Sequence, residues 1–273
     1  MSEADVIKQS NKPQSKTSIK KDLQALGLKS GDIILVHSSM SKIGWIAGRE
    51  IAVIEALLEV VGLQGTIVMP SFTGENSQPE LWQNPPVPAS WVDQIKNEML
   101  PFDPLTTPTR EMGLIAEAFW HYPGTLRSNH PQVSMSGHGK LAKSIIENHQ
   151  LSPGFGRFSP LQRVYDLNGK VLLLGVDYNR CTCMHLAEVW LNKENQWYLD
   201  GACIKENGQV IWKEFLEIAY DESDFLEIGG KYEQENNVIN GLVGQASAKL
   251  IDVKSLCDFA FEWMLKNRKQ RYY

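Results

Sequence analysis

The sequence predicts an α/β fold, and three observations support this prediction. Short apolar runs at residues 33–36, 66–69 and 170–174 indicate buried β-strands. Amphipathic helical stretches alternate with these runs, so that residues 33–69 follow the order strand, helix, strand of one βαβ unit. Of the 273 residues, 42% are hydrophobic and 22% are charged, which is typical of a globular domain of ordinary composition.

The net charge and the cysteines restrict the setting and the partners of the chain. A formal net charge of −5 disfavours nucleic acid as a partner and is compatible with a cationic small substrate. Because no apolar run is long enough to span a bilayer and no signal peptide is evident, we expect no membrane partner. The cysteines follow no disulfide-rich pattern, so a reduced, cytoplasmic setting is expected.

The N-terminal part divides into a polar segment and the start of a single domain. Residues 1–16 are polar and are expected to be disordered, whereas residues 17–273 are expected to form one domain. A helix capped by Thr17 or Ser18 opens this domain. The first strand follows, and a second helix over about 48–61 leads to the second strand.

The loop after the first strand has the small residues that a phosphate-binding loop needs. It runs from His37 to Gly44 and carries serine at positions 38, 39 and 41. Small side chains let backbone N–H groups approach a phosphate, and the start of the next helix adds partial positive charge. The loop has neither the P-loop spacing nor GxGxxG, and an ordinary serine-rich turn explains it equally well.

Residues 70–108 form a proline-rich insertion. They contain eight of the chain's thirteen prolines, together with aromatic residues and carboxylates that include Phe102 and Asp103. A long excursion of this kind is often a lid or binding loop, and aromatic faces beside carboxylates suit a cationic, hydroxylated ligand. A loop that only covers the core is an equal alternative.

The next segment contains a helix over 110–120, a turn-rich loop, a strand over 133–137 and a further helix. Thr107 or Thr109 is placed to cap the first of these helices. In the loop, Arg127 and His130 could bind phosphates. An arginine that holds the loop through its carbonyl groups is as good an explanation.

The stretch from Gly175 to Trp190 follows the strand over 170–174 and becomes an amphipathic helix. In open α/β sheets, ligands bind where strands end in this way. Thr182, His185 and Glu188 recur every three residues, so a helix would bring them to one face and let the carboxylate hold one imidazole nitrogen. The other nitrogen could then take a proton, although a purely structural His-x-x-Glu pair is common.

Two other chemistries are open for the same stretch. Cys181, Cys183 and His185 alternate, so an extended segment could present three zinc ligands, but the spacing is unusual and no fourth ligand is evident. Cys183 could also be a nucleophile that His185 activates, or simply a small packing residue. We therefore expect no metal.

The C-terminal part completes the predicted sheet. Asn207–Gly208 indicates a hairpin over residues 203–212, whose exposed edge could build a homodimer interface. The acidic cluster at 221–224 could supply a partner for the histidine. A strand over 247–251 and a final helix capped by Asp252 follow, and the basic end over 266–271 complements the negative end of that helix.

Four stretches of the chain carry a resemblance through their order and spacing. They are Val36–Ser39 through Gly44; Phe102–Pro104 through Thr109, with Met112–Gly113; Arg127–Pro131, with Ser134 and Gly137; and Thr182 through His185 to Glu188. Together they resemble the antibiotic acetyltransferase family, the aminoglycoside 3-N-acetyltransferases and their bacterial relatives. The resemblance implies a three-layer α/β/α sandwich-like fold distinct from the GNAT acetyltransferases, with acetyl-coenzyme A as donor, an amine as acceptor and a link to antibiotic resistance.

The resemblance also implies the site residues. His185 would be catalytic, with Glu188 beside it and Asp224, or else Asp221 or Glu222, as a second acidic partner. Independently of the resemblance, we expect Thr182 or a backbone N–H at the helix start to donate to the thioester oxygen. Thr73 and Asp103 would face the acceptor. The cofactor would be bound by His37, Ser38, Ser39, Met40, Ser41, Lys42, Ile43, Gly44, Thr109, Arg127, Ser134 and Gly137. A non-catalytic relative that binds coenzyme A or a sugar amine would use the same residues.

Overall fold

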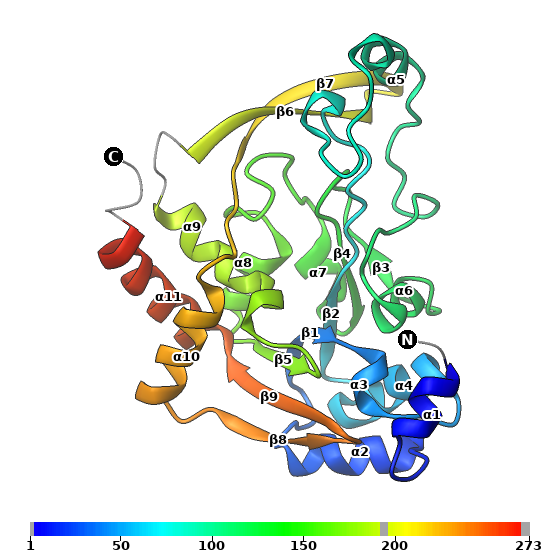
Figure 1. Ribbon diagram of the computed structural model, residues 1–273, viewed down its shortest axis with the longest axis vertical. Coiled ribbons are helices and arrows are strands. Elements are labelled where there is room, and N and C mark those ends of the chain that lie inside the picture. Colours follow the sequence, from blue (N-terminus) through cyan, green and yellow to red (C-terminus); the bar gives the residue numbers. More distant parts are fainter. Residues whose placement is uncertain (1–2, 192–195, 269–273) are drawn as a thin grey trace.

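The computed structural model of the protein describes residues 3–191 and 196–268 (Figure 1). Within this part of the chain, a seven-stranded mixed sheet has the order β3-β4-β2-β1-β5-β9-β8. Its strands are β1 Ile33–Ser38, β2 Thr66–Pro70, β3 Leu126–Arg127, β4 Met135–Gly139, β5 Lys170–Leu174, β8 Ile239–Val243 and β9 Ala246–Asp252. The predicted strands over 33–36, 66–69, 170–174 and 247–251 are confirmed.

The centre of the sheet is parallel. Strand β1 pairs in parallel with β2 on one side and with β5 on the other. The predicted βαβ unit is therefore confirmed. Because parallel strands end at the same edge of a sheet, the residues that follow Ser38, Pro70 and Leu174 meet there.

Alternating side chains divide the sheet into two hydrophobic faces. Ile34 and Val36 of β1 belong to one buried cluster, and Leu35 between them belongs to the other. Helices α2 (Lys16–Ala25), α4 (Arg49–Val61) and α6 (Leu114–Trp120) cover the first face. Helices α7 to α11, which lie between residues 142 and 267, cover the second face. Figure 1 shows α8 to α11 on the side of the sheet away from α2 and α4. The three layers that the resemblance implied are confirmed.

The predicted helices occur in the predicted order. The α-helices are α1 Glu3–Gln9, α2 Lys16–Ala25, α3 Met40–Ile43, α4 Arg49–Val61, α5 Val92–Glu98, α6 Leu114–Trp120, α7 Ala142–Ile146, α8 Pro160–Asp166, α9 His185–Leu191, α10 Phe225–Glu235 and α11 Val253–Asn267. Of these, α1, α3, α5, α8 and α10 are helices that were not predicted. The short 3-10 helices are η1 Pro79–Leu81, η2 Ala89–Trp91, η3 Tyr178–Arg180 and η4 Thr182–Met184. No helix in the described ranges is both long and apolar enough to cross a membrane.

Two local predictions were wrong. Residues 1–16 were expected to be disordered, but α1 occupies part of this segment and is fixed by tertiary contacts, including a hydrogen bond of 3.1 Å from the Trp45 indole to Glu3. The helix expected from residue 110 begins only at Leu114. Glu111 and Gly113 have positive φ values of 57° and 83°, which no right-handed helix can include.

The proline-rich insertion and the hairpin form one outgrowth at the carboxyl edge of the sheet (Figure 1). The hairpin is longer than predicted, with β6 Trp197–Glu206 and β7 Gln209–Ile218. Asn76 exchanges two hydrogen bonds of 2.7 Å with the backbone of Cys203, and the Phe102 N–H donates to the same carbonyl group. The insertion is therefore hydrogen-bonded to the hairpin from two of its segments, at Asn76 and at Phe102.

The outer surface of the hairpin carries exposed apolar residues. Leu199 and Leu216 are cross-strand neighbours, and each is about half exposed. Assembly of a homodimer through this surface stays a prediction.

Candidate active site

The centre of the candidate site is His185, the first residue of α9. Strand β5 ends at Leu174, and the chain then turns at Gly175, where φ is 69° and a Cβ atom would lie 2.7 Å from the Cβ of Lys42. Only glycine fits this turn. Two short 3-10 helices follow and deliver His185 to the edge of the sheet where β1, β2 and β5 end. The prediction that the stretch after residue 174 connects a strand to a helix is confirmed.

His185 and Glu188 form a buried dyad. The imidazole Nδ1 lies 2.5 Å from Glu188 Oε2, as the i, i+3 spacing predicted. The Glu188 side chain has no exposed surface, whereas 13% of the His185 side chain is exposed. An ionised Glu188 accepts a hydrogen bond from Nδ1–H. It thereby fixes the tautomer in which Nδ1 carries the proton and Nε2 is unprotonated. The nitrogen that can act as a base is thus the one that faces away from the protein carboxylate.

Three aromatic rings fix the plane of the imidazole. The Phe155 ring is stacked on it with centroids 5.2 Å apart and planes within 4°. Tyr220 and Phe225 contact it at inclined angles, with centroids 5.1 and 4.9 Å away. These contacts leave the ring little rotational freedom about its side-chain bonds. None of the three rings was predicted to lie at the site, because no local spacing in the sequence connects them to residue 185.

Behind the dyad lies an arginine from the end of α11. Arg268 Nη1 donates to Glu188 Oε1 at 2.5 Å, and the Asp221 N–H donates to the same oxygen at 2.9 Å. The acidic cluster does lie near the histidine, but the prediction that Asp224 pairs with His185 was wrong. The Asp224 carboxylate is hydrogen-bonded to Arg268, which separates it from the dyad.

His37 is the second histidine at this edge. It lies near the end of β1, is 6% exposed, and its Nε2 has no hydrogen-bond partner in the described part of the chain. Burial and, to a smaller extent, the nearby His185 together lower the pKa of His37 to about 3. The ring is therefore neutral at pH 7. A buried imidazole nitrogen without a protein partner is a natural contact point for a ligand.

The serine-rich loop after β1 is only partly available to a ligand. Ser38, Ser39, Met40 and Ser41 are half-buried and Lys42 is exposed. Met40, Ser41 and Gly44 help to line a pocket of about 130 Å³ that α1 and α4 also border. Ile43, in contrast, is fully buried in the core. Its side chain therefore packs in the core, and a contact of the Ile43 backbone with the cofactor stays a prediction.

Arg127 is hydrogen-bonded to other parts of the protein, and its contact with a cofactor stays a prediction. Arg127 Nε donates to the Ser134 hydroxyl at 2.9 Å, and the two Nη groups donate to the carbonyls of Thr107 and Ser71. Burial lowers the pKa of Arg127 to about 10, so it remains charged at neutral pH. The Arg127 side chain thus holds backbone carbonyl groups, as in the alternative that was given for this arginine.

Two residues of the motif around Arg127 were wrongly placed at the cofactor. Ser134 is fully buried, and its hydroxyl donates to the Ser71 carbonyl at 2.6 Å. Gly137 is buried in β4, where a Cβ atom would lie 3.1 Å from Ile146. Because neither has surface to offer, direct contact with a ligand is contradicted by the geometry.

His130 and His149 connect this motif to His185. Their Nε2–H groups donate to the carbonyls of Leu151, at 3.1 Å, and Gly154, at 2.6 Å. Burial lowers the pKa of His149 to about 4 and that of His130 well below its usual value, so both are neutral. The loop that they hold carries Phe155, the ring stacked on the imidazole.

The remaining predicted residues lie around the edge of the site. Thr73 is buried, and its hydroxyl donates to the Pro131 carbonyl. Thr109 donates to the Glu117 carboxylate, and Asp103 Oδ1 accepts from the Leu105 N–H at 2.8 Å. Thr182 begins η4, three residues before His185, and is almost fully buried. Thr73 is therefore used internally, whereas Asp103 and Thr109 keep partial exposure.

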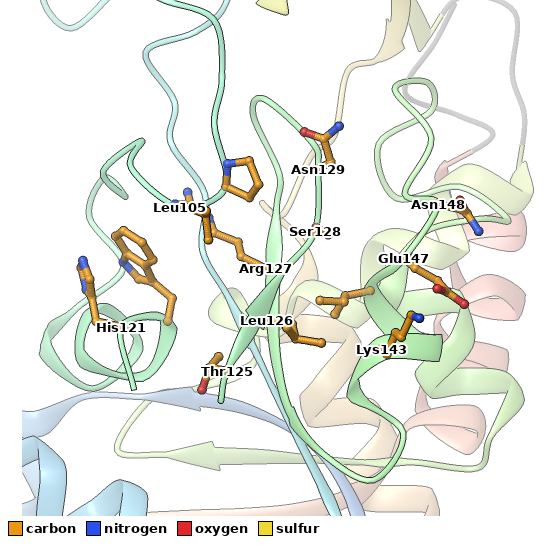
Figure 2. Close-up of a pocket in the computed structure, with 13 residues that line it drawn as sticks. Leu105, His121, Thr125, Leu126, Arg127, Ser128, Asn129, Lys143, Glu147 and Asn148 are labelled. Carbon is orange, nitrogen blue, oxygen red and sulfur yellow. The ribbon is translucent and has the colours of Figure 1, made fainter. Parts of the chain in front are cut away.

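A pocket of about 490 Å³ lies beside β3 and α7 (Figure 2). Figure 2 shows Asn129, Lys143, Glu147 and Asn148 around it. It shares no lining residue with the dyad or with the loop after β1. We therefore place the chemistry at His185, where a free imidazole nitrogen lies at the carboxyl edge of the sheet, and not in this pocket.

Neither rival chemistry finds support in the geometry. Cys183 is fully buried and packs in the core with Cys181, whose sulfur is 3.5 Å from its own. A nucleophile must reach its substrate, and this thiol has no surface. Within residues 3–191 and 196–268, no group of three or more histidine, cysteine or acidic side chains is arranged to hold a metal ion.

The chain is similar to known proteins over nearly its whole length. A family model described as aminoglycoside 3-N-acetyltransferase matches residues 35–265. The SPbeta prophage-derived aminoglycoside N(3')-acetyltransferase-like protein YokD of Bacillus subtilis (strain 168) is 43% identical over 263 residues, 96% of each chain. Aminoglycoside N(3)-acetyltransferase IX of Micromonospora chalcea is 31% identical over 282 residues, 97% of this chain and 98% of the relative.

Solved structures give the same result. The crystal structure of YokD has a TM-score of 0.96 at 42% identity and covers 98% of this chain and 99% of its own. The structure of AAC-IIIb in its binary complex with CoASH has a TM-score of 0.83 at 28% identity and covers 93% of this chain and 97% of its own. The similarity includes every stretch in which the sequence motifs were found.

Proposed function

Because this chain belongs to the aminoglycoside 3-N-acetyltransferase family, we propose that it acetylates an amine of an aminoglycoside or a similar amino sugar, with His185 as the general base. The family uses acetyl-coenzyme A as its acetyl donor. The chain is thus an aminoglycoside 3-N-acetyltransferase-like acyltransferase.

The observation that carries the role of His185 is the buried dyad. An amine attacks a thioester only when it is neutral, whereas amino-sugar amines are mostly protonated at neutral pH. His185 Nε2 accepts the proton that the ammonium must lose, and Glu188 stabilises the imidazolium that results. The amine nitrogen then bonds to the acetyl carbon as the bond to sulfur breaks. The proton passes to the leaving thiolate, so that the products are the amide and free coenzyme A.

This role has the right magnitude. General-base assistance contributes about 10²–10⁴ in rate. Holding both substrates side by side supplies much of the remaining acceleration, so that no covalent acyl-enzyme is needed. The burial of Cys183 supports direct transfer over a cysteine-bound intermediate.

The donor fits the loop after β1. Ser38, Ser39 and Ser41 are small, polar and partly exposed, which suits the pyrophosphate of the cofactor. The neutral His37 places an unpartnered nitrogen deeper in the same edge, where it can hydrogen-bond the acyl end. Thr182, in the helix that precedes His185, remains the proposed donor to the thioester oxygen.

The acceptor fits the outgrowth formed by the insertion and the hairpin. Tyr220 lies two residues beyond β7 and contacts the His185 ring, so the base of the hairpin borders the catalytic centre. Asp103, in the insertion that is hydrogen-bonded to this hairpin, keeps partial exposure and can attract a cationic amine.

The direct test measures thiol release from acetyl-coenzyme A with a panel of amines: aminoglycosides, simple amino sugars and small alkylamines. We expect release that depends on the aminoglycosides or amino sugars, together with calorimetric binding of the donor. Binding of donor and aminoglycoside without any thiol release would favour a non-catalytic sensor instead. Absence of donor binding would overturn the proposal.

A further inference from the structure

The end of helix α11 reaches the catalytic dyad from the far side. Arg268 follows α11 directly and is 1% exposed, although its neighbours Lys266 and Asn267 are exposed. The basic end over 266–271 was expected to complement the negative end of this helix. Residues 269–271 of that basic end lie outside the described residues. Figure 1 shows α11 beside α9 and α10. Arg268 contacts Glu188 of α9 and two residues just before α10, Asp221 and Asp224.

The contacts of Arg268 fix the position of its charge. Nε and Nη2 form a two-point pair with the Asp224 carboxylate, at 2.8 and 2.5 Å, and Nη2 also donates to the Asp221 carbonyl at 2.6 Å. This pair sets the plane of the guanidinium. Nη1 is thereby directed at Glu188 Oε1, 2.5 Å away.

Burial makes this cation chemically significant for Glu188. A carboxylate without exposed surface tends to take up a proton, because burial disfavours the charged form. A nearby cation opposes that tendency. Burial alone would lower the Arg268 pKa, but its hydrogen bonds to Asp224 and Glu188 outweigh burial and raise the pKa, so that the guanidinium is permanently charged.

The state of Glu188 decides which imidazole nitrogen carries the proton. An ionised Glu188 accepts from Nδ1–H and leaves Nε2 unprotonated. A protonated Glu188 would donate to Nδ1 instead, and the ring proton would move to Nε2. Such an imidazole cannot take a proton from the acceptor amine.

We propose that Arg268 is a positioning residue of the transfer reaction: through its bond to Glu188 it keeps that carboxylate ionised and thereby keeps His185 Nε2 free to act as the base. The inference rests on the proposed role of His185. The alternative is that Arg268 only anchors α11 to the rest of the protein, in which case it affects stability but not the titration of the dyad.

The other titratable groups near the dyad would not produce the shift of the pH profile that we expect from replacing Arg268. The titratable and charged side chains that surround it are Arg268, Asp221, Asp224, Tyr220, His37 and Cys183. Burial raises the pKa of Tyr220 well above its usual value and lowers that of His37 to about 3, so both stay neutral between pH 5 and pH 9. Glu217, which contacts Tyr220, has a pKa of about 7, but it titrates in wild type and variants alike.

The test is the pH dependence of kcat and kcat/KM for Arg268→Met and Arg268→Lys. In Arg268→Met we expect kcat at pH 7 to fall about 10²-fold, within the range of general-base effects. The KM for acetyl-coenzyme A should stay within about threefold, because Arg268 does not reach the donor loop. The rising limb of the profile should move to higher pH by roughly one unit or more, since Glu188 then ionises only at higher pH. Arg268→Lys keeps a cation and should keep the limb near its wild-type position.

Two controls separate charge from packing. Lys266→Met removes one positive charge from the exposed end of the same helix and should leave both kinetic constants and the pH profile unchanged. In the double variant Glu188→Gln/Arg268→Met there is no carboxylate to keep ionised. Its kcat should equal that of Glu188→Gln alone, whereas independent effects would multiply.

The outcomes distinguish the two proposals. If Arg268→Met folds, as judged by its melting temperature and circular dichroism, and keeps the wild-type pH profile while His185→Ala is inactive, the Arg268 inference fails and the role of His185 stands. Near-normal turnover in His185→Ala would remove the premise of both. If Arg268→Met does not fold, Arg268→Lys decides: a limb that moves upward by roughly one unit or more although the cation is kept would overturn the inference.

Discussion

Glu217 couples the stability of the active-site loop to pH. It lies in β7 and is almost fully buried. Its Oε2 accepts from the Gly154 N–H at 2.8 Å, and Oε1 accepts from the Ile218 N–H at 2.8 Å and the Tyr220 hydroxyl at 3.1 Å. Gly154 directly precedes Phe155, the ring that is stacked on His185. Glu217→Gln is therefore a perturbation that reaches the site through its supporting loop.

The direction and size of the effect follow from the Glu217 pKa. Burial raises it from an ordinary value of 4.5 to about 7, against the opposing effect of its hydrogen bonds. Between pH 4.5 and about pH 7, Glu217 holds a proton in the folded protein that it has lost in the unfolded chain. The free energy of unfolding therefore falls as pH rises through this window and is flat with respect to this group above it. The full difference corresponds to about 3 kcal/mol.

The assay compares wild type and Glu217→Gln in thermal and denaturant unfolding at pH 5 and pH 8. Glutamine stays neutral, so between pH 5 and pH 8 the variant should gain about 2.5 kcal/mol relative to wild type, or roughly 5 °C in relative melting temperature. All other titrating groups are common to both proteins and cancel. Glu214→Gln, an exposed change on the same strand, should show no such gain. A stability difference between Glu217→Gln and wild type that does not vary with pH would refute the reasoning.

Three further predictions concern the site itself. His37→Ala should raise the KM for acetyl-coenzyme A about two- to tenfold, the worth of one ordinary hydrogen bond, and an unchanged donor affinity by calorimetry would argue against its contact with the donor. Phe155→Leu should lower kcat, on the order of tenfold, because the imidazole loses the ring that fixes its plane; a shift in KM alone would contradict this. Cys183→Ala should keep kcat within about threefold while lowering the melting temperature through the small cavity it leaves, and complete loss of turnover in a folded variant would revive the cysteine nucleophile.

Much of the sheet could be predicted because its determinants are local. The runs at 33–36, 66–69 and 170–174 are uninterrupted and apolar, as strands buried on both faces must be. The Asn207–Gly208 pair specifies its turn directly, since both residues adopt positive φ, 51° and 79°. The His185–Glu188 pair is likewise local, because helical geometry alone brings residues three apart together.

The residues that could not be predicted act through distant contacts. Arg268 and Glu188 are 80 positions apart, and nothing in the basic C-terminal stretch distinguishes an arginine that turns inward from a lysine such as Lys266 that is exposed. Asp224 was placed in the right neighbourhood but with the wrong partner for the same reason. Phe155 lies in a loop of glycine and proline whose path depends on His130, His149 and Glu217.

The motif residues show a second limit. Ser134 and Gly137 belong to a stretch that resembles the family, and the resemblance alone does not tell a ligand contact from a packing requirement. In the structure, Gly137 leaves room for α7 and Ser134 bridges Arg127 to the Ser71 carbonyl. Both residues shape the fold that presents the site, which is a sufficient reason for their place in the motif.

The most direct measurement of the central claim is the steady-state kcat of His185→Ala for thiol release, with acetyl-coenzyme A and an aminoglycoside, beside calorimetric titration of the same variant with coenzyme A. We predict a fall in kcat of about 10²–10⁴, the loss of the rising limb of the pH profile, and a coenzyme A affinity within about threefold of wild type, because the donor loop after β1 is untouched. Near-normal turnover in a folded His185→Ala variant would contradict the account.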